Sequence, residues 1–305
     1  MRWAILAVVV FLPLAAGAQT LDQAMGSVVS VLPEWPPDAR RQDEPEGSGV
    51  VILDGRTIVT ALHVVDKALS IRVRTFEGDI LSARLTGRDR ATDIATLKIG
   101  KALRPITMAN RKLELGEKVC AIGNAFGLGL SVSCGVVSGT HRAGLGFNRV
   151  EDFVQTDAAV NPGSSGGALV TGEGKFVGLL SAIFTKTSDA NIGINFAASA
   201  RLTHDVAVQL KQAGRVKRPI SGMKLEQVPA KEETGRLGVR IVSVRDGFIG
   251  EKAGLKAGDI ILRAGGRRVR KPADFVSTMS GLLGSDILEI EIERGGAALK
   301  LLLKK

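Results

Sequence analysis

The sequence predicts a mainly β protein built from two domains. Between residues 26 and 199 the chain contains many short apolar and β-branched runs at regular spacing, separated by glycine-containing turns. This pattern is typical of β-barrels or a β-sandwich. A second series of strand-like runs begins beyond a basic stretch at residues 215–218. With 305 residues, of which 45% are hydrophobic, the chain is long enough to form two cores.

The first expected strands are VVSVL, VVIL and RTIVT, which begin at Val28, Val50 and Arg56. The Asp54-Gly55 pair between the last two runs favours a tight type I′ hairpin. The acidic, proline-bearing residues 33–46 predict a loop after the first strand.

A helix is expected where the first domain ends. Ser199 is a suitable N-cap, and Leu202, Val206 and Leu210 recur at the spacing of one helical face. Gly214 suits the left-handed C-cap position. These signals place a helix between Ser199 and Gly214.

The second domain combines strands with a further helix. RLGVRIVSV, AGLKAGDIIL and ILEIEIER are strand-like, and PADFVSTMSGLL predicts a helix with Pro272 in its first turn. The apolar side chains expected to face inward are Phe275, Val276, Met279 and Leu283.

The segment TDAAVNPGSSGGALV, residues 156–170, sets Ser165 among three glycines. Gly163, Gly166 and Gly167 allow the backbone to adopt positive φ and bring bare N–H groups close to a substrate carbonyl, as an oxyanion hole requires. The alternative is an ordinary Gly/Ser turn between two strands.

Two upstream segments supply partners for this serine. TIVTALHVV ends an apolar, β-branched run at His63, and ATDIATLKI opens an alternating strand with Asp93. A serine becomes a nucleophile when an imidazole removes its proton, and a carboxylate fixes the tautomer of that imidazole. Taken singly, His63 could be a core residue and Asp93 a turn former. The GxSxG pattern at Ser165 also occurs in α/β-hydrolases, but their order is Ser, Asp, His, whereas this chain has His, Asp, Ser.

At these residues the chain resembles the HtrA/Deg-type serine proteases. The resemblance spans roughly residues 25–305 and rests on GSGVVI, TALHVV, TDIATLKI, VCAIGNAFGLG, QTDAAVNPGSSGGALV and AGLKAGD. It implies a chymotrypsin-like double β-barrel protease domain, residues 19–215, followed by a PDZ domain, a β-sandwich with two helices, at residues 216–305.

The resemblance also implies roles for single residues. It makes His63 the general base, Asp93 the carboxylate that orients it, and Ser165 the nucleophile. The backbone N–H groups of Gly163 and Ser165, together with Ser164, correspond to the oxyanion hole. Digestive proteases carry an aspartate where this chain has Ser164, and that aspartate pairs with a newly cut N-terminus. Because serine cannot form this ion pair, we expect neighbouring loops or substrate to order the oxyanion loop.

The resemblance further outlines a substrate pocket. Ala159 would form its base, which leaves no charge to attract lysine or arginine. The expected walls are Val160, Ser181, Ile183 and Ile194. Small aliphatic walls favour valine or alanine before the scissile bond.

In the PDZ domain the resemblance implies a carboxylate-binding loop at residues 219–223. Backbone N–H groups around Ser221 and Gly222 would receive a peptide C-terminus, while the peptide adds a strand to the sheet edge. Ile220 and Met223 would flank the pocket for its last side chain. Ser221 replaces an apolar residue that is usual here, and the alternative is a plain surface turn.

The N-terminus predicts a signal peptide at residues 1–18. Arg2 precedes an apolar run, and Ala16-Gly17-Ala18 is a cleavage motif. We therefore expect a periplasmic protein without a transmembrane span after removal of this leader, the alternative being an uncleaved anchor. Cys120 and Cys134 lie on two strand-like runs that flank NAFGLG, so they form either a cross-strand disulfide or two buried thiols.

The net charge is +10, but the chain has no tyrosine and no RNP, helix-turn-helix or zinc-site spacing. This composition argues against nucleic-acid binding, and no cofactor is expected. The expected function is proteolysis of unfolded or damaged envelope proteins, with peptide C-termini bound at the PDZ domain. A homotrimer is a further expectation from the family. The alternatives are a non-proteolytic PDZ-containing chaperone or adaptor, and a basic protein that binds envelope surfaces.

Overall fold

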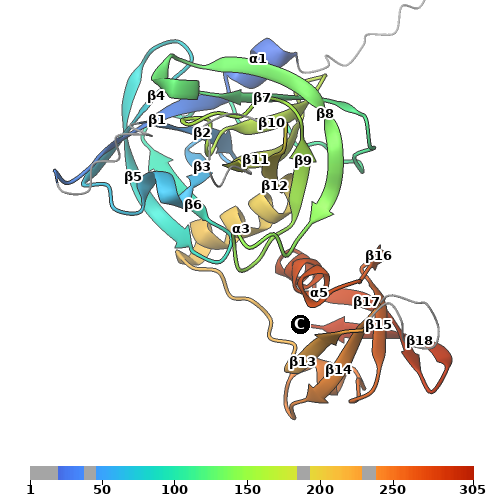
Figure 1. The fold of residues 1–305 in the computed structure, drawn as a ribbon. Helices are drawn as coiled ribbons and strands as arrows, with labels where there is room; N and C mark the ends of the chain where they lie inside the picture. The colour runs from blue at the N-terminus through green and yellow to red at the C-terminus, as the bar shows by residue number, and fades with distance from the viewer. Residues whose placement is uncertain (1–19, 38–45, 184–192, 229–237) are drawn as a thin grey trace, which may run out of the picture.

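Two closed six-stranded β-barrels form the N-terminal part of the computed structural model, which describes residues 20–37, 46–183, 193–228 and 238–305 (Figure 1). The first barrel has the strand order β1-β2-β3-β6-β5-β4, and all its pairs are antiparallel. Its strands are β1 (Val28–Glu34), β2 (Gly47–Ile52), β3 (Thr57–Ala61), β4 (Ser70–Arg74), β5 (Ile80–Asp89) and β6 (Ile94–Ile99). The expected tight hairpin is wrong: Ile52 pairs with Thr57, so four residues form the β2–β3 turn.

The second barrel follows with the order β10-β11-β12-β9-β8-β7. Its strands are β7 (Lys118–Gly123), β8 (Ser131–Arg142), β9 (Phe153–Thr156), β10 (Ala168–Thr171), β11 (Phe176–Ile183) and β12 (Asn195–Ser199). Separate apolar clusters fill the two barrel interiors, and a third cluster lies between the barrels. Val51 faces the first interior, whereas Val50 and Ile52 face the inter-barrel cluster. Both faces of β2 are therefore buried, which explains its continuous apolar run.

The C-terminal part is a sheet of order β13-β14-β15-β17-β18, with β16 paired to β15. Its strands are β13 (Met223–Gln227), β14 (Val239–Val244), β15 (Ile260–Ala264), β16 (Arg267–Arg268), β17 (Ile287–Arg294) and β18 (Ala297–Lys304). The sheet and its helices enclose a core of their own, which includes Phe275, Leu282 and Ile290. The mainly β prediction, with a double barrel followed by a PDZ domain, is confirmed.

Helices are few and short among the described residues. They are α1 (Leu21–Met25), α2 (Leu62–Val65), α3 (Ala200–Ala213), α4 (Ile249–Lys252) and α5 (Pro272–Met279), with 3-10 turns η1 (Ala125–Gly127) and η2 (Ser280–Leu283). The predicted α3 is confirmed: Ser199 caps it by accepting the N–H of Leu202, and Gly214 ends it at φ +67°. Within the described ranges, no helix has both the length and the apolarity needed to cross a bilayer. The expected leader lies outside those ranges.

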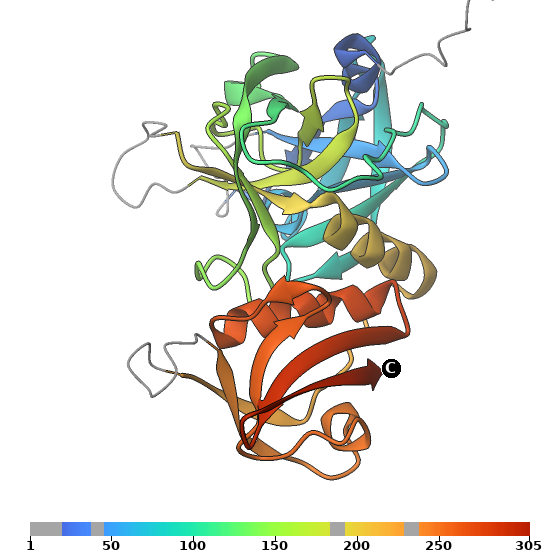
Figure 2. The same cartoon turned by 90° about the vertical axis from the view of Figure 1, so that its right-hand side faces the viewer.

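Helix α5 and turn η2 lie on the side of the PDZ sheet that is next to the barrels (Figure 2). The expectation for Val276 is wrong, and the expectation for Leu283 holds for its burial but not for the core that it enters. Val276 is 40% exposed, because the inward face of α5 is formed by Phe275 and Met279. Leu283 is buried, but it packs into the inter-barrel cluster beside α3 instead of the PDZ core. Leu283 is therefore an apolar contact between the two domains.

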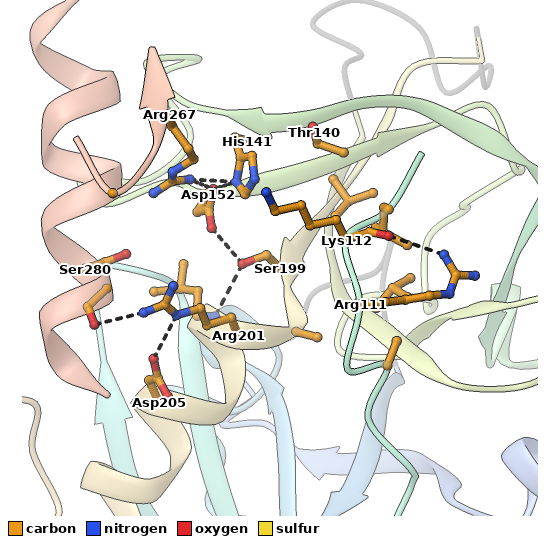
Figure 3. A pocket seen from close by; sticks show the side chains of 18 of the residues that line it. Arg111, Lys112, Thr140, His141, Asp152, Ser199, Arg201, Asp205, Arg267 and Ser280 are labelled. Atoms are coloured by element: carbon orange, nitrogen blue, oxygen red, sulfur yellow. Dashed lines mark hydrogen bonds and ion pairs between the residues drawn. The ribbon is translucent and has the colours of Figure 1, made fainter. Parts of the chain in front are cut away.

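A polar cluster centred on Asp152 lies at the same domain boundary (Figure 3). The Asp152 carboxylate accepts hydrogen bonds from Ser199 Oγ at 2.8 Å on the barrel side and from Arg267 Nη1 at 2.8 Å on the PDZ side. Nδ1 of His141 lies 2.8 Å from the same carboxylate. Burial by itself would raise the pKa of Asp152, but its contacts with His141, Arg267 and Ser199 hold the pKa below the ordinary value. These residues line a cavity of about 660 Å³ between the domains.

Candidate active site

His63 lies in the single turn of helix α2, directly after strand β3, and Asp93 lies in the turn before strand β6. Strands β3 and β6 are paired, with Ala61 opposite Ile94. This register brings the residues that follow one strand next to those that precede the other. The backbone N–H of Leu62 donates to the carbonyl of Asp93 at 2.8 Å and fixes the two turns together.

The Asp93 carboxylate contacts His63 through both of its oxygens. Oδ1 accepts the backbone N–H of His63 at 2.9 Å, and Oδ2 lies 2.5 Å from Nδ1 of the ring. An ionised carboxylate only accepts hydrogen bonds, so the proton of this short contact belongs to Nδ1. When the ring is neutral, this tautomer leaves Nε2 as its basic atom. Asp93 holds φ +58°, an uncommon conformation for a residue other than glycine, as is often found at functional sites.

The turn that carries Ser165 packs directly against the segment before His63. A Cβ added to Gly166 would lie 2.4 Å from Thr60 Oγ1 and 2.9 Å from the N atom of Ala61. Gly166 has φ +84° and leaves no room for a side chain. Ser165 is partly exposed on this turn. The fold therefore brings the segments of His63 and Asp93, from the first barrel, next to the segment of Ser165, from the second.

Two N–H groups of the Ser165 loop are left available to a ligand. Those of Gly163 and Ser165 donate to no acceptor within the described part of the chain. The expectation for Ser164 is wrong, because its N–H donates to the carbonyl of Asn161 at 2.9 Å and closes a turn. Two neighbouring N–H groups without acceptors can bind an oxyanion.

The residues expected around the substrate pocket differ in how exposed they are. Ala159 is exposed, and its N–H donates to Ser133 Oγ at 3.0 Å. Ser181 and Ile194 are partly buried. Val160 is only 2% exposed and packs in the core of the second barrel, so it does not face an open pocket. Ile183 ends β11, and its side chain lies outside the described residues.

The loop expected to bind a carboxylate precedes strand β13. Gly222 has φ +73°, and a Cβ there would lie 2.3 Å from that of Phe248. The carbonyl of Ser221 accepts the N–H of Gly250 at 3.0 Å, and the N–H of Met223 points to Ser221 Oγ at 3.3 Å. Ile220 is exposed, whereas Met223 packs against the PDZ core.

Cys120 and Cys134 are directly opposed on β7 and β8 and form a disulfide, with their sulfur atoms 2.07 Å apart. The pair lies next to Ser133, which holds the N–H of Ala159. Among the described residues, no group of three or more His, Cys, Asp or Glu side chains is arranged to hold a metal ion.

Two polar residues beside the site were not singled out from the sequence. Ser48 in strand β2 is fully buried and bonds to the Ser165 loop. Asn124 is also buried, and its side chain joins Glu46 to the N–H of Gly129. The signal that could have identified Ser48 is its place as a polar residue within the apolar run GSGVVI, since a buried hydroxyl needs a hydrogen-bond partner.

Comparisons with known proteins agree with this geometry. The trypsin-like peptidase domain family matches residues 47–179, and the PDZ domain family matches residues 191–304. A probable periplasmic serine endoprotease DegP-like from Pseudomonas savastanoi pv. phaseolicola is 38% identical over 271 residues, which cover 87% of this chain and 56% of the relative. The periplasmic serine endoprotease DegP of Escherichia coli (strain K12) is 39% identical over 232 residues, 73% of this chain and 49% of the relative. The chain thus spans about half the length of these curated relatives.

One solved structure matches this chain over nearly the whole length of both chains. The HtrA-type protease AlgW with tripeptide superposes with a TM-score of 0.71 at 32% identity, covering 93% of this chain and 94% of that one. The chain belongs to the HtrA-type serine proteases.

Proposed function

We propose that this chain is a periplasmic serine endopeptidase that cleaves unfolded or damaged envelope proteins. The observation that carries the proposal is the double contact of Asp93 with His63, at 2.9 Å and 2.5 Å, beside a loop with two N–H groups available at Ser165. The relatives from Pseudomonas savastanoi and Escherichia coli are named periplasmic serine endoproteases, which supports both the activity and the location.

The proposed reaction is acyl transfer in two halves. His63 removes the proton of Ser165 as its Oγ attacks the peptide carbonyl, and the N–H groups of Gly163 and Ser165 stabilise the oxyanion. The imidazolium formed is stabilised by Asp93 and gives its proton to the leaving amine. Water, activated by the same imidazole, then hydrolyses the acyl-enzyme. These steps require no cofactor.

Substrate choice is proposed to follow from two regions. The exposed Ala159 and the partly buried Ser181 and Ile194 carry no charge, and we propose that they suit a small aliphatic residue before the scissile bond. In the PDZ domain, the loop at Ser221 and Gly222 is proposed to receive a peptide C-terminus. We propose a protease unit at residues 19–215 and a PDZ unit at residues 216–305. Assembly as a homotrimer stays a prediction, which light scattering tests.

Digestion of casein by the wild-type chain and by Ser165→Ala tests the activity. We expect cleavage by the wild type alone, and labelling by a fluorophosphonate that the substitution abolishes. An unlabelled wild type would contradict the proposal and favour a non-proteolytic adaptor. Repeating the digestion with and without a peptide carrying a free C-terminus tests the PDZ role, and peptides with valine or lysine before the scissile bond test the pocket.

A further inference from the structure

Hydrogen bonds to its backbone carbonyl groups hold the loop of Ser165 in place. The carbonyls of Pro162, Gly163 and Ser165 each accept a hydrogen bond from a group outside the loop. The carbonyl of Pro162 accepts the N–H of Phe126 at 2.7 Å. In a planar trans peptide the C=O and N–H groups point in opposite directions. Holding the carbonyl of Pro162 therefore turns the N–H of Gly163 toward the opposite side, where it meets no acceptor among the described residues.

Ser48, on strand β2 of the first barrel, hydrogen-bonds to two further carbonyls of this loop, those of Gly163 and Ser165. Its hydroxyl donates to the carbonyl of Gly163 at 2.8 Å, and its backbone N–H donates to the carbonyl of Ser165 at 2.9 Å. The same hydroxyl accepts the backbone N–H of Asn124 at 2.8 Å. Thr60 Oγ1 donates to the carbonyl of Ser48 at 2.6 Å and so fixes the backbone of Ser48 itself.

One hydroxyl thus joins the two loops that set the oxyanion N–H groups. The loop after β7 begins at Asn124 and contains Phe126, whose N–H holds Pro162. Both Ser48 and Asn124 are fully buried, so water does not replace a lost partner easily. Without the hydroxyl, the carbonyl of Gly163 and the N–H of Asn124 would both lack a partner, and the peptide planes at Gly163 would be free to rotate.

We propose that Ser48 is a positioning residue for the oxyanion hole. It orders the loop that an aspartate and a new N-terminus order in digestive proteases, a pair that Ser164 cannot form. The inference rests on the proposed proteolytic function. Ser48 touches neither substrate nor the reacting atoms. It acts by holding the carbonyls of Gly163 and Ser165 and, through Asn124, the loop whose Phe126 N–H fixes the peptide that carries the Gly163 N–H.

The test compares Ser48→Ala and Ser48→Cys with Ser27→Ala. Ser27 is a matched control, because its hydroxyl is fully buried and has no hydrogen-bond partner in the described part of the chain. Active sites are first counted by fluorophosphonate titration, and kcat and KM are then measured per titrated site with a fluorogenic peptide that has valine before the scissile bond. A peptide aldehyde, whose adduct carries an oxyanion, reports on the hole separately.

We expect Ser48→Ala to lower kcat per site by on the order of 10²-fold, the effect of losing an oxyanion donor, with KM changed by less than about 3-fold. The aldehyde should lose affinity in parallel. Ser48→Cys should fall between Ala and wild type, because a thiol is a weaker donor. Ser27→Ala should match the wild type.

Unchanged kcat per site in Ser48→Ala would overturn the proposal, since a merely structural serine would reduce only the amount of titratable enzyme. If Ser48→Ala does not fold, Ser48→Cys decides, and a wild-type rate in that variant would overturn the proposal as well. A wild-type chain that is neither labelled nor active would instead defeat the proposed function. The two failures are therefore distinguishable.

Discussion

Replacing Arg267 by alanine should loosen the PDZ domain from the barrels. Arg267 lies on β16, and its Nη1 contacts the buried Asp152 at 2.8 Å across the domain boundary. The arginine side chain is 25% exposed and that of Asp152 is 7% exposed, so solvent screens this pair only weakly. Ser277 Oγ, 3.3 Å from the same carboxylate, also contacts it from the PDZ side.

The size of the effect follows from what remains around Asp152. After the substitution, Ser199 still donates to the carboxylate and His141 still lies beside it. The charge is therefore not left without partners, and the cost is that of one hydrogen bond to a charged group, about 2 kcal/mol. At about 1.4 kcal/mol per factor of ten, the ratio of docked to undocked PDZ domain should fall roughly 30-fold.

Limited proteolysis of the basic linker between the domains, residues 215–218, measures this ratio, because the linker is cut more readily in the undocked state. Arg268→Ala is the matched control, since Arg268 is the next residue on β16, is exposed and forms no ion pair within the described residues. Arg267→Ala should be cut faster than the control by an amount that disappears in an Asp152→Asn background. Equal cutting of the Arg267 and Arg268 variants would refute the reasoning.

Three further outcomes are expected. Replacing both Cys120 and Cys134 by serine should lower the free energy of unfolding by about 3 kcal/mol, the value for a loop of this size, and denaturant unfolding with and without reductant checks it. Gly166→Ala should abolish fluorophosphonate labelling, because its Cβ would lie 2.2 Å from the carbonyl of Ser48 at a φ of +84°; labelling at the wild-type rate would contradict this. Burial alone would raise the pKa of Asp259, but the hydrogen bonds from Arg294 outweigh it and hold the pKa below 3.8. A lowered pKa gives stability that is present above the unfolded pKa and is lost as the pH falls through the folded pKa. Acid should therefore destabilise the PDZ domain below about pH 4. Arg294→Ala should weaken this pH dependence, as measured by amide exchange, because the Lys256 N–H still holds the carboxylate.

Local signals in the sequence were sufficient for the elements whose physics is local. Helix α3 was predicted with both caps, because Ser199 and Gly214 act on their own neighbouring backbone groups. Pro272 likewise begins α5 as expected, since a missing N–H is tolerated in the first turn. The β2–β3 turn was missed because pairing of Ile52 with Thr57 leaves four residues in it, and the Asp54-Gly55 signal fits a shorter connection.

Contacts between distant segments had no such local signal. The hydrophobic spacing of PADFVSTMSGLL correctly indicates that Leu283 is buried, but periodicity does not tell which core a residue enters, and this one packs beside α3 of the other domain. The same limit explains Asp152 and Ser48. Each is a polar residue with one partner more than a hundred positions away, Arg267 for Asp152 and Gly163 for Ser48. A buried polar group needs partners, so the sequence indicates that such partners exist, and the fold determines which groups they are. In this chain both pairs join structural units, PDZ to barrel and barrel to barrel, and the second of them sets the geometry on which the proposed chemistry depends.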